Sequence, residues 1–385
     1  MGPGLYVHLP WCVRKCRYCD FHSHAWRDQD LTRTVDALLC EAERRAGGMR
    51  PKTVFVGGGT PTLLPAPELR RLLDGLDAVT SFRASAVEVT CEANPESFDD
   101  ARAEALRAGG VDRISLGVQS LDDATLARWD RVHDADAARA AFRRAREHGF
   151  VRVNVDLIFG WPGHDAEAWR TELEEVLGWE PEHVSCYELM VEPDTALGRA
   201  ARRGRFAPAD DRHRRRLFDL TREVCAAHGF GGYEVSAFAR AGEACAHNLN
   251  YWRSGEWVGL GVGATSRSER ELRTNLTDPA AWTEAALATG DPVGEVERPD
   301  PRTRLFDRFL MGLRLPEEGV DLARARDATG LDPERVFGDA WRTLLDDGRL
   351  ERAAPDRIRV GEEGLRHLDT VLLELLPDET RVHEV

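Results

Sequence analysis

The chain has 385 residues, of which 42% are hydrophobic, a share typical of globular proteins. Because single hydrophobic cores stop growing at roughly 250–300 residues, this length predicts more than one domain. The charged residues, 52 Lys and Arg against 67 Asp and Glu, give a net charge of −15 at pH 7. So acidic a chain is not expected to be a general nucleic-acid binder, since contacts to phosphates need positive surface.

Residues 4–190 alternate short β-branched runs with longer amphipathic segments. Apolar runs bounded by Gly, Pro or Asn predict strands at residues 5–9, 53–56, 86–91, 113–118, 151–158 and 183–188. Apolar residues at helical spacing predict helices between them, at residues 31–46, 68–76, 100–108, 135–148 and 167–177. This alternation predicts a parallel sheet with crossover helices, either an open doubly wound sheet or an incomplete barrel.

Three cysteines follow the first predicted strand: Cys12, Cys16 and Cys19. A structural zinc site takes four ligands and cubane iron–sulfur clusters usually take four cysteines. Three thiolates would therefore leave one iron of a [4Fe–4S] cluster open to a substrate or cofactor. Two alternatives remain, namely a zinc knuckle completed by His8, His22 or His24, and three reduced structural cysteines.

The stretch around these cysteines reads Tyr-x-His-x-Pro-aromatic followed by Cys-x3-Cys-x2-Cys. It resembles the radical S-adenosylmethionine (SAM) superfamily, and within it the relatives of oxygen-independent coproporphyrinogen III oxidase. The resemblance implies a partial (β/α)6 barrel and a [4Fe–4S] cluster whose open iron is chelated by the amino and carboxylate groups of SAM. An electron from a donor would allow the cluster to cleave SAM to methionine and a 5′-deoxyadenosyl radical. Tyr6 and Tyr18 would pack near this cofactor.

A glycine-rich run, residues 57–62, follows the second predicted strand. Glycines let a backbone approach a ligand closely because they lack Cβ atoms, but a plain tight turn explains the run equally well. The run has neither the lysine of a phosphate-binding P-loop nor the spacing of Gly-x-Gly-x-x-Gly. The resemblance assigns it to the motif that meets the SAM amino group and implies roles for Gly59 and Thr60.

Further polar residues stand on or just beyond the next strands, where α/β proteins place ligand sites. Asp156 lies inside an otherwise apolar strand, and a buried carboxylate needs a partner or a ligand. Glu92 could accept hydrogen bonds from ribose hydroxyls, or be a solvated loop acid. The resemblance implies that the SAM pocket includes Glu92, Gln119, Arg131 and Asp156.

The second half contains the string Cys245-Ala246-His247-Asn248-Leu249-Asn250-Tyr251-Trp252. Histidine can ligate haem iron and aromatic rings can stack on a porphyrin, although a single histidine is more often structural. The His-Asn-x-x-Tyr-Trp pattern resembles the HemW branch, the radical SAM haem chaperones, which implies haem binding through His247. Two residues depart from that branch: Thr265 stands where a histidine is expected, and Ala237 where an asparagine is expected.

Three regions are expected, with residues 1–200 as the radical SAM barrel and residues 201–299 as a linking region that carries the haem-type string. The arginine-rich segment 199–216 marks the first boundary. In residues 300–385, helices at 302–313, 322–329, 333–346 and 363–376 and a hairpin around 354–356 predict a winged-helix-like module. Its 14 basic and 20 acidic residues argue against DNA binding.

These observations predict a haem chaperone that binds haem and passes it to a haem protein, such as a respiratory one, with the cluster and SAM gating the transfer. Two enzymatic alternatives remain: oxidative decarboxylation of coproporphyrinogen III, and SAM-dependent methylation or cyclopropanation. The oxidase is expected to carry a fourth cysteine where Phe21 stands. Whether the chain is itself an enzyme stays open, and no catalytic residue is assigned.

No stretch approaches the ~18 apolar residues of a membrane-spanning helix, and Cys12 comes too early for a secretory signal to precede it. The eight cysteines are therefore interpreted as reduced thiols. We expect a cytoplasmic protein, with any membrane contact peripheral to the inner face. A homodimer is the oligomer considered, because two subunits can share one haem.

Overall fold

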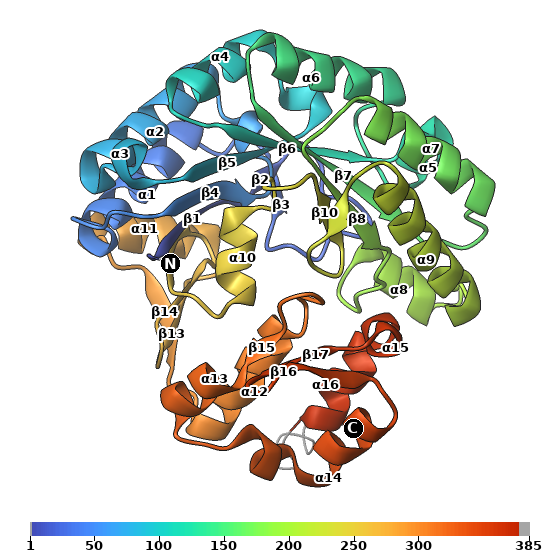
Figure 1. The fold of residues 1–385 in the computed structure, drawn as a ribbon. Coiled ribbons are helices and arrows are strands. Elements are labelled where there is room, and N and C mark those ends of the chain that lie inside the picture. The colour runs from blue at the N-terminus through green and yellow to red at the C-terminus, as the bar shows by residue number, and fades with distance from the viewer. Residues whose placement is uncertain (1, 377–385) are drawn as a thin grey trace.

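The computed structural model describes residues 2–376, and its central feature is a strongly curved sheet (Figure 1). Six strands follow one another in chain order and pair in parallel: β1 (Gly4–Leu9), β4 (Thr53–Gly58), β5 (Glu88–Ala93), β6 (Arg113–Gln119), β7 (Arg152–Phe159) and β8 (His183–Glu188). The ends of each strand lie within two residues of the predicted ones. The sheet forms an open arc, so the predicted partial (β/α)6 barrel is confirmed.

Helices cover the convex face of this arc: α1 (Leu31–Arg45), α2 (Ala66–Thr80), α4 (Asp100–Ala108), α6 (Ala135–Glu147) and α7 (Ala166–Gly178). Several begin after an aspartate whose carboxylate accepts a backbone N–H of the first turn, as Asp30 does for α1 and Asp99 for α4. Shorter elements complete this half: β2 (Trp11–Cys12), β3 (His24–Ala25), η1 (Pro61–Leu63), α3 (Phe82–Ser85), η2 (Pro95–Ser97) and α5 (Asp123–Arg128).

Residues beyond 200 extend the same sheet at both edges. β11 (Trp257–Gly261) pairs in parallel with β1 and is followed outward by β12 (Thr265–Arg267), β13 (Leu272–Asn275) and β14 (Val293–Glu297). On the other edge, β10 (Ala237–Ala239) and β9 (Gly231–Gly232) follow β8. The chain between these strands forms α8 (Ala196–Arg202), α9 (Asp211–Ala227), α10 (Ala246–Trp252) and α11 (Pro279–Thr289). β11 was not expected, because glycine occupies two of its five positions.

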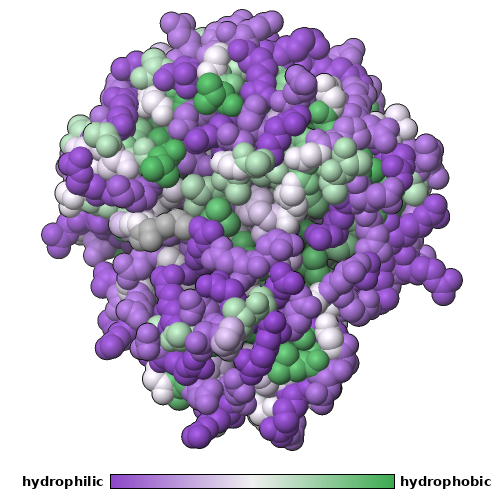
Figure 2. All heavy atoms as spheres, viewed as in Figure 1, coloured by the Kyte–Doolittle hydropathy of each residue, from purple (hydrophilic) through white to green (hydrophobic). Residues whose placement is uncertain are grey.

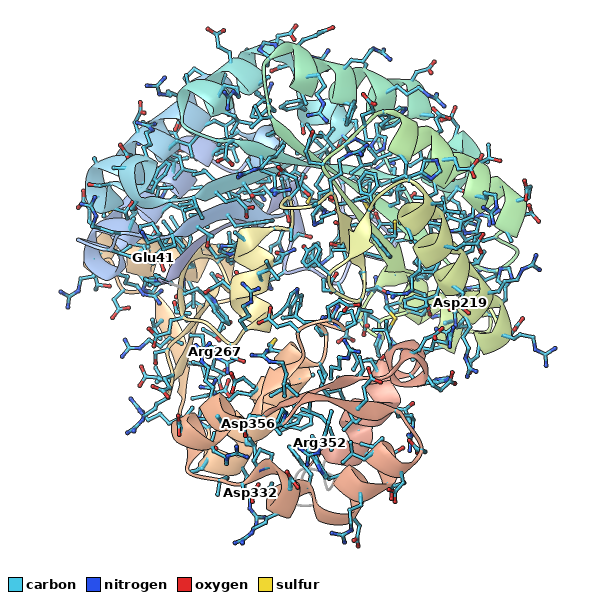
Figure 3. All side chains as sticks on the ribbon, in the orientation of Figure 1. Glu41, Asp219, Arg267, Asp332, Arg352 and Asp356 are labelled. Carbon is cyan, nitrogen blue, oxygen red and sulfur yellow. The ribbon has the colours of Figure 1, made fainter. Side chains whose placement is uncertain are left out.

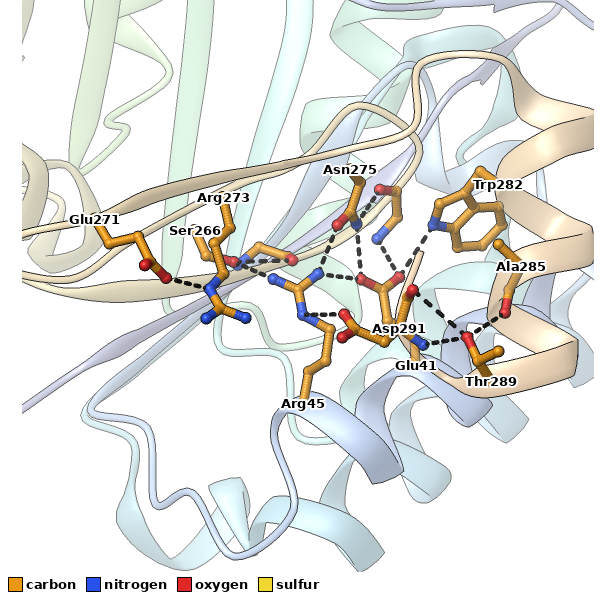
Figure 4. Close-up of polar contacts among 12 residues, drawn as sticks. Glu41, Arg45, Ser266, Glu271, Arg273, Asn275, Trp282, Ala285, Thr289 and Asp291 are labelled. Carbon is orange, nitrogen blue, oxygen red and sulfur yellow. Dashed lines mark hydrogen bonds and ion pairs between the residues drawn. The ribbon is translucent and has the colours of Figure 1, made fainter. Parts of the chain in front are cut away.

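A buried carboxylate ties these added strands to the first helix (Figure 4). Glu41 of α1 accepts hydrogen bonds from the N–H of Gly261 (2.9 Å), the amide of Asn275 (2.7 Å) and the indole of Trp282 (3.1 Å). Arg45, one turn later, forms an ion pair with Glu41 at 2.6 Å. Burial raises the pKa of Glu41, and the charge of Arg45 and the hydrogen bonds oppose that shift. The network therefore joins α1, β11, β13 and α11 around one acid.

Residues 301–375 form a C-terminal unit with a hydrophobic core of its own. Its elements are α12 (Pro301–Gly312), β15 (Val320–Asp321), α13 (Leu322–Thr329), α14 (Pro333–Asp346), β16 (Leu350–Ala354), β17 (Arg357–Val360), α15 (Glu362–Arg366) and α16 (Leu368–Leu375). The strands form an antiparallel sheet in the order β15-β17-β16. The interpretation of this unit as a winged helix stays a prediction.

The prediction of one helix over residues 363–376 is wrong, because the chain breaks at His367 (φ −131°, ψ 35°) between α15 and α16. Gly364 of α15 passes so close to the carbonyl of Arg349 that a Cβ atom would not fit. Leu365 of α15 and the buried apolar residues of α16 both join the core of the unit. The break at His367 therefore lies between two segments that pack into the same core.

Ion pairs join the two units, among them Arg253 with Glu318 (2.7 Å) and Arg366 with Asp219 (2.9 Å). On the face shown in Figure 2 most residues are hydrophilic, and apolar residues gather in the band between the sheet and the C-terminal unit. Among residues 2–376, no helix combines the length and the apolar character that crossing a bilayer requires.

Candidate functional site

A cavity of about 710 Å³ opens on the concave side of the sheet. The cysteine loop, strands β4 to β8, α10 and one side chain of the C-terminal unit, Arg314, line it. All predicted site residues except Thr60 contribute to its wall: Tyr6, Cys12, Cys16, Tyr18, Cys19, Gly59, Glu92, Gln119, Arg131, Asp156 and His247. Residues from distant parts of the sequence thus surround a single space.

The cysteine loop connects β1 to β3 and is fixed at two points. The N–H of Arg17 donates to the carbonyl of Trp129 (3.3 Å), and the carbonyl of Arg17 accepts from the N–H of Leu197 at the start of α8 (2.8 Å). Within the loop, the N–H of Cys19 donates to the carbonyl of Cys16 at 3.2 Å. The loop therefore holds its thiols against the cavity rather than in bulk solvent.

The three thiols are free and half-buried. Burial raises the pKa of Cys12 to about 11; a hydrogen bond with Thr60 opposes this, and the neighbouring Cys19 and Cys16 add to it. Each thiolate of a cubane binds a different iron, whereas a structural zinc site takes four ligands on one ion. The loop offers three thiols, a donor set that fits a [4Fe–4S] cluster with one open iron.

The glycine run packs against the end of β1. Gly59 N–H donates to the carbonyl of Leu9 (2.7 Å) and Thr60 N–H to that of Trp11 (2.8 Å). A Cβ atom on Gly59 would collide with these same backbone segments, and Gly58 has a positive φ of 105°. The glycines are thus required by the fold itself. Thr60 is buried behind the cavity wall, where its hydroxyl accepts a hydrogen bond from Asn94 (2.9 Å).

Two carboxylates face the cavity from neighbouring parts of the sheet. Glu92 accepts a hydrogen bond from the N–H of Gly58 (2.9 Å), while burial, followed by the charge of Asp156, raises its pKa to about 8. Asp156 accepts from the hydroxyl of Ser115 (3.0 Å) and from the amide of Asn154 (2.8 Å), and burial raises its pKa. Both acids have protein partners and still border the open space.

Arg131 connects three parts of the wall. Its Nη2 donates to Asn94 Oδ1 (2.8 Å) and to the carbonyl of Gly117 (2.6 Å), and its Nη1 lies 3.4 Å from the sulfur of Cys16. Nε of Arg131 is buried without a hydrogen-bond partner in the described chain. Gln119, at the end of β6, adopts a positive φ of 69°, which is uncommon for a residue with a side chain and turns the strand end beside the cavity. The guanidinium therefore fixes the strand ends next to the cysteine loop.

The two predicted tyrosines come from different segments: Tyr6 from β1, and Tyr18 from the cysteine loop itself, between Cys16 and Cys19. Tyr6 hydrogen-bonds through its hydroxyl to Nδ1 of His8 at 2.9 Å, and its ring lies 6.2 Å from that of Phe55. The ring of Tyr18 meets Trp129 edge to face at 6.2 Å. Both rings are held by neighbouring side chains and contribute flat surfaces to the cavity wall.

His247 is held from both sides. Its Nδ1 hydrogen-bonds to the hydroxyl of Thr53 (2.8 Å), and its Nε2 to the hydroxyl of Tyr251 one turn later (2.8 Å). Its backbone N–H donates to Glu88, a buried acid that also pairs with Arg113. Burial lowers the pKa of His247 to about 4. In this arrangement both ring nitrogens are occupied, so a haem iron could reach His247 only after one of these bonds opened.

Several residues of the site were not predicted. Asn94, Ser115, Asn154 and Tyr251 all line the cavity and hydrogen-bond to predicted residues. Tyr251 belongs to the string that drew attention to His247, and Asn94 closes the strand that carries Glu92, so both had a signal in the sequence. Arg314 had no such signal, because it comes from the C-terminal unit. Its guanidinium lies over the ring of Trp252, the last residue of α10, at 4.5 Å from the ring centroid.

Comparisons with known proteins agree with this architecture. The model of the radical SAM superfamily matches residues 6–176, and that of the HemN C-terminal domain matches residues 300–367. The fold is similar to that of coproporphyrinogen III oxidase (HemN) from Escherichia coli, with a TM-score of 0.83, 22% identity, and coverage of 97% of this chain and 90% of that one. The fold and the superfamily match define a radical SAM protein.

Relatives with higher sequence identity show which family within this superfamily the chain belongs to. The haem chaperone HemW of Escherichia coli (strain K12) is 39% identical over 286 residues, which cover 71% of this chain and 73% of the relative. HemW of Mycobacterium tuberculosis (strain H37Rv) is 36% identical over 349 residues, 89% of this chain and 88% of the relative. The mitochondrial radical S-adenosyl methionine domain-containing protein 1 of Mus musculus is 33% identical over 97% of this chain and 87% of its own. The chain belongs to the HemW family.

Proposed function

We propose that this protein is a haem chaperone, which binds haem and delivers it to a haem protein, with a SAM-bound [4Fe–4S] cluster in the same cavity. The observation that carries the proposal is that the cysteine loop and the His247 segment of α10 line one space. Membership of the HemW family and the name haem chaperone of its relatives support the same conclusion.

The chain offers suitable residues for the cluster and for SAM. Cys12, Cys16 and Cys19 would hold three irons, and the fourth would bind the amino and carboxylate groups of SAM. When bound and reduced by an electron donor, this pair can generate a 5′-deoxyadenosyl radical. The residues proposed for the SAM pocket are Tyr6, Tyr18, Gly59, Thr60, Glu92, Gln119, Arg131 and Asp156. Thr60 does not line the cavity and would act indirectly, through its hydrogen bonds with Cys12 and Asn94.

The mouth of the cavity suits a flat apolar ligand. Three of its residues, Phe21, Val132 and Met190, expose 66%, 48% and 52% of their surface. Exposed large apolar side chains grouped at a cavity are typical of a binding surface. A porphyrin could cover them while its iron is directed toward α10 and His247. Phe21 also occupies the position where the oxidase is expected to carry a fourth cysteine, which favours the chaperone.

The test is a haemin titration followed by the Soret absorbance. Wild-type protein should bind haemin with a shifted Soret band, and His247→Ala should lose at least about tenfold in affinity, the factor expected for a lost iron ligand contact worth more than about 1.4 kcal/mol. His228→Ala is the matched control, because His228, which follows the last residue of α9, is exposed and does not line the cavity. An identical spectrum and affinity in His247→Ala would contradict the role of His247.

We further propose a haem protein, such as a respiratory one, as the acceptor, and a cytoplasmic location with peripheral contact to the inner face of the membrane. The eight free thiols support a reducing compartment. A homodimer is proposed as the assembly that would share a haem between two cavity mouths. Anaerobic incubation with SAM, dithionite and coproporphyrinogen III separates this function from the oxidase, because a chaperone should not accumulate protoporphyrinogen.

A further inference from the structure

A second cavity, of about 390 Å³, lies where the sheet meets the C-terminal unit. Arginines from three elements line it. Arg267 ends β12 and is labelled in Figure 3 at this junction, Arg304 and Arg308 lie one turn apart on α12, and Arg324 is on α13. Arg308 and Arg324 also line a small adjoining cavity of about 90 Å³. The junction therefore brings four guanidinium groups together around open space.

Three of these four guanidinium groups lack a carboxylate partner, whereas about half of the arginines in the described residues have one. Arg267 has one distant partner, Asp307 at 4.0 Å. Within residues 2–376, the side chains of Arg304, Arg308 and Arg324 form no ion pair, and Nε of Arg304 is buried without a hydrogen-bond partner. Three acids also line the cavity, Glu256, Glu269 and Asp327, and all three are exposed, as is Arg324. The half-buried charged side chains of the lining are those of Arg267, Arg304 and Arg308.

Such an arrangement costs folding free energy when nothing occupies it. Like charges one helical turn apart destabilise a helix, as Arg304 and Arg308 do in α12. Burial, followed by the nearby charges of Arg267 and Arg324, lowers the pKa of Arg308, while Glu269 opposes the shift. Burial also lowers the pKa of Arg267. Proteins retain such unfavourable contacts between like charges mainly at functional sites. The repulsion between these arginines therefore favours a binding site.

We infer that this arginine pocket binds a small phosphorylated anion. The planar guanidinium group donates in a fork that matches phosphate oxygens, and several such groups can share one polyanion. The lining contains no aromatic residue and is more polar than apolar, so it does not suit a porphyrin. Because Arg267 comes from the sheet and the other three arginines from the C-terminal unit, the anion bridges the two units. This inference does not depend on the haem-chaperone function.

The experiment is calorimetric titration of the full chain with inorganic pyrophosphate and, separately, with ATP, at constant ionic strength set by chloride. Wild-type protein should bind one pyrophosphate per chain, and Arg308→Gln should raise the dissociation constant at least about tenfold, as the loss of one charge-assisted hydrogen bond does. Arg302→Gln is the matched control, since it removes the same charge from the exposed side of α12, and its dissociation constant should stay within about twofold of wild type.

Melting curves without anion check that the variants fold. Arg308→Gln should melt at the same temperature as wild type or higher, because like-charge repulsion is relieved. If ATP binds more tightly than pyrophosphate and Arg308→Gln loses this binding, the ligand is a nucleotide. If both bind equally tightly, the pocket recognises the phosphate group alone. Absence of pyrophosphate and ATP binding, or equal losses in Arg308→Gln and Arg302→Gln, would overturn the inference.

Discussion

Nε2 of His247 and the phenolic oxygen of Tyr251 lie 2.8 Å apart, on successive turns of α10. This hydrogen bond occupies the nitrogen that a haem iron could take, so ligand binding and the resting arrangement of α10 compete. In the haem-binding role that we propose for His247, this hydrogen bond must open before the iron can bind, and its opening has a cost that can be measured.

Tyr251→Phe removes that competition. A buried hydrogen bond contributes about 0.5–1.5 kcal/mol net, so its loss should tighten haemin binding by roughly two- to tenfold. Tyr233→Phe is the matched control, because Tyr233 makes an equivalent bond to Nε2 of His183 at 2.9 Å; haemin affinity should not change there. Weaker haemin binding in Tyr251→Phe would mean that Tyr251 itself holds the ligand.

Glu41→Ala should be strongly destabilising. The substitution leaves Arg45, Asn275, Trp282 and the N–H of Gly261 without their common acceptor, and loss of one partner from a buried pair costs roughly 3–5 kcal/mol. Chemical denaturation followed by circular dichroism measures the change. Glu43→Ala, exposed on the same helix, should change the free energy of unfolding by no more than about 0.5 kcal/mol. Similar values for both variants would refute the role given to the Glu41 network.

The raised pKa of Glu92 predicts that the free energy of unfolding depends on pH. Burial and Asp156 raise its folded-state pKa to about 8, above that of the unfolded chain. The protonated acid therefore contributes stability at low pH, and this contribution is lost as the pH rises through about 8. In cofactor-free protein, Glu92→Gln should stabilise the fold relative to wild type at pH 9, by roughly 1–3 kcal/mol, but not at pH 5. Glu104→Gln, exposed on α4, serves as control; an effect of Glu92→Gln that is the same at both pH values would exclude this origin.

The sequence was sufficient for the parts of the fold that follow local patterns. Alternating apolar runs located the six central strands, and the polar motifs were placed on these strands or just beyond them. That Cys12, Glu92 and Asp156 share one site was implied by the resemblance to the radical SAM superfamily. The contacts between distant residues could not be predicted in this way. Nothing in the pattern indicates that Glu41 reaches β11 or that Arg131 joins Asn94 to Gly117, since such bonds depend on how the elements pack.

Two further differences have similar causes. β11 was missed because its glycines suppress the apolar pattern, although close contact with the neighbouring backbone requires them. His247 could be placed at the site from its motif, yet its hydrogen bonds to Thr53 and Tyr251 emerge only when α10 packs below β4.

The central claim, that three cysteines hold a cluster with an iron open to SAM, is tested most directly by anaerobic reconstitution followed by electron paramagnetic resonance of the reduced protein. We predict four irons per chain and a cluster signal that changes on addition of SAM; Cys16→Ser should lose this signal, and Cys40→Ser, which alters a cysteine outside the cavity, should keep it. A protein without a four-iron species, or with a signal that ignores SAM, would contradict the account.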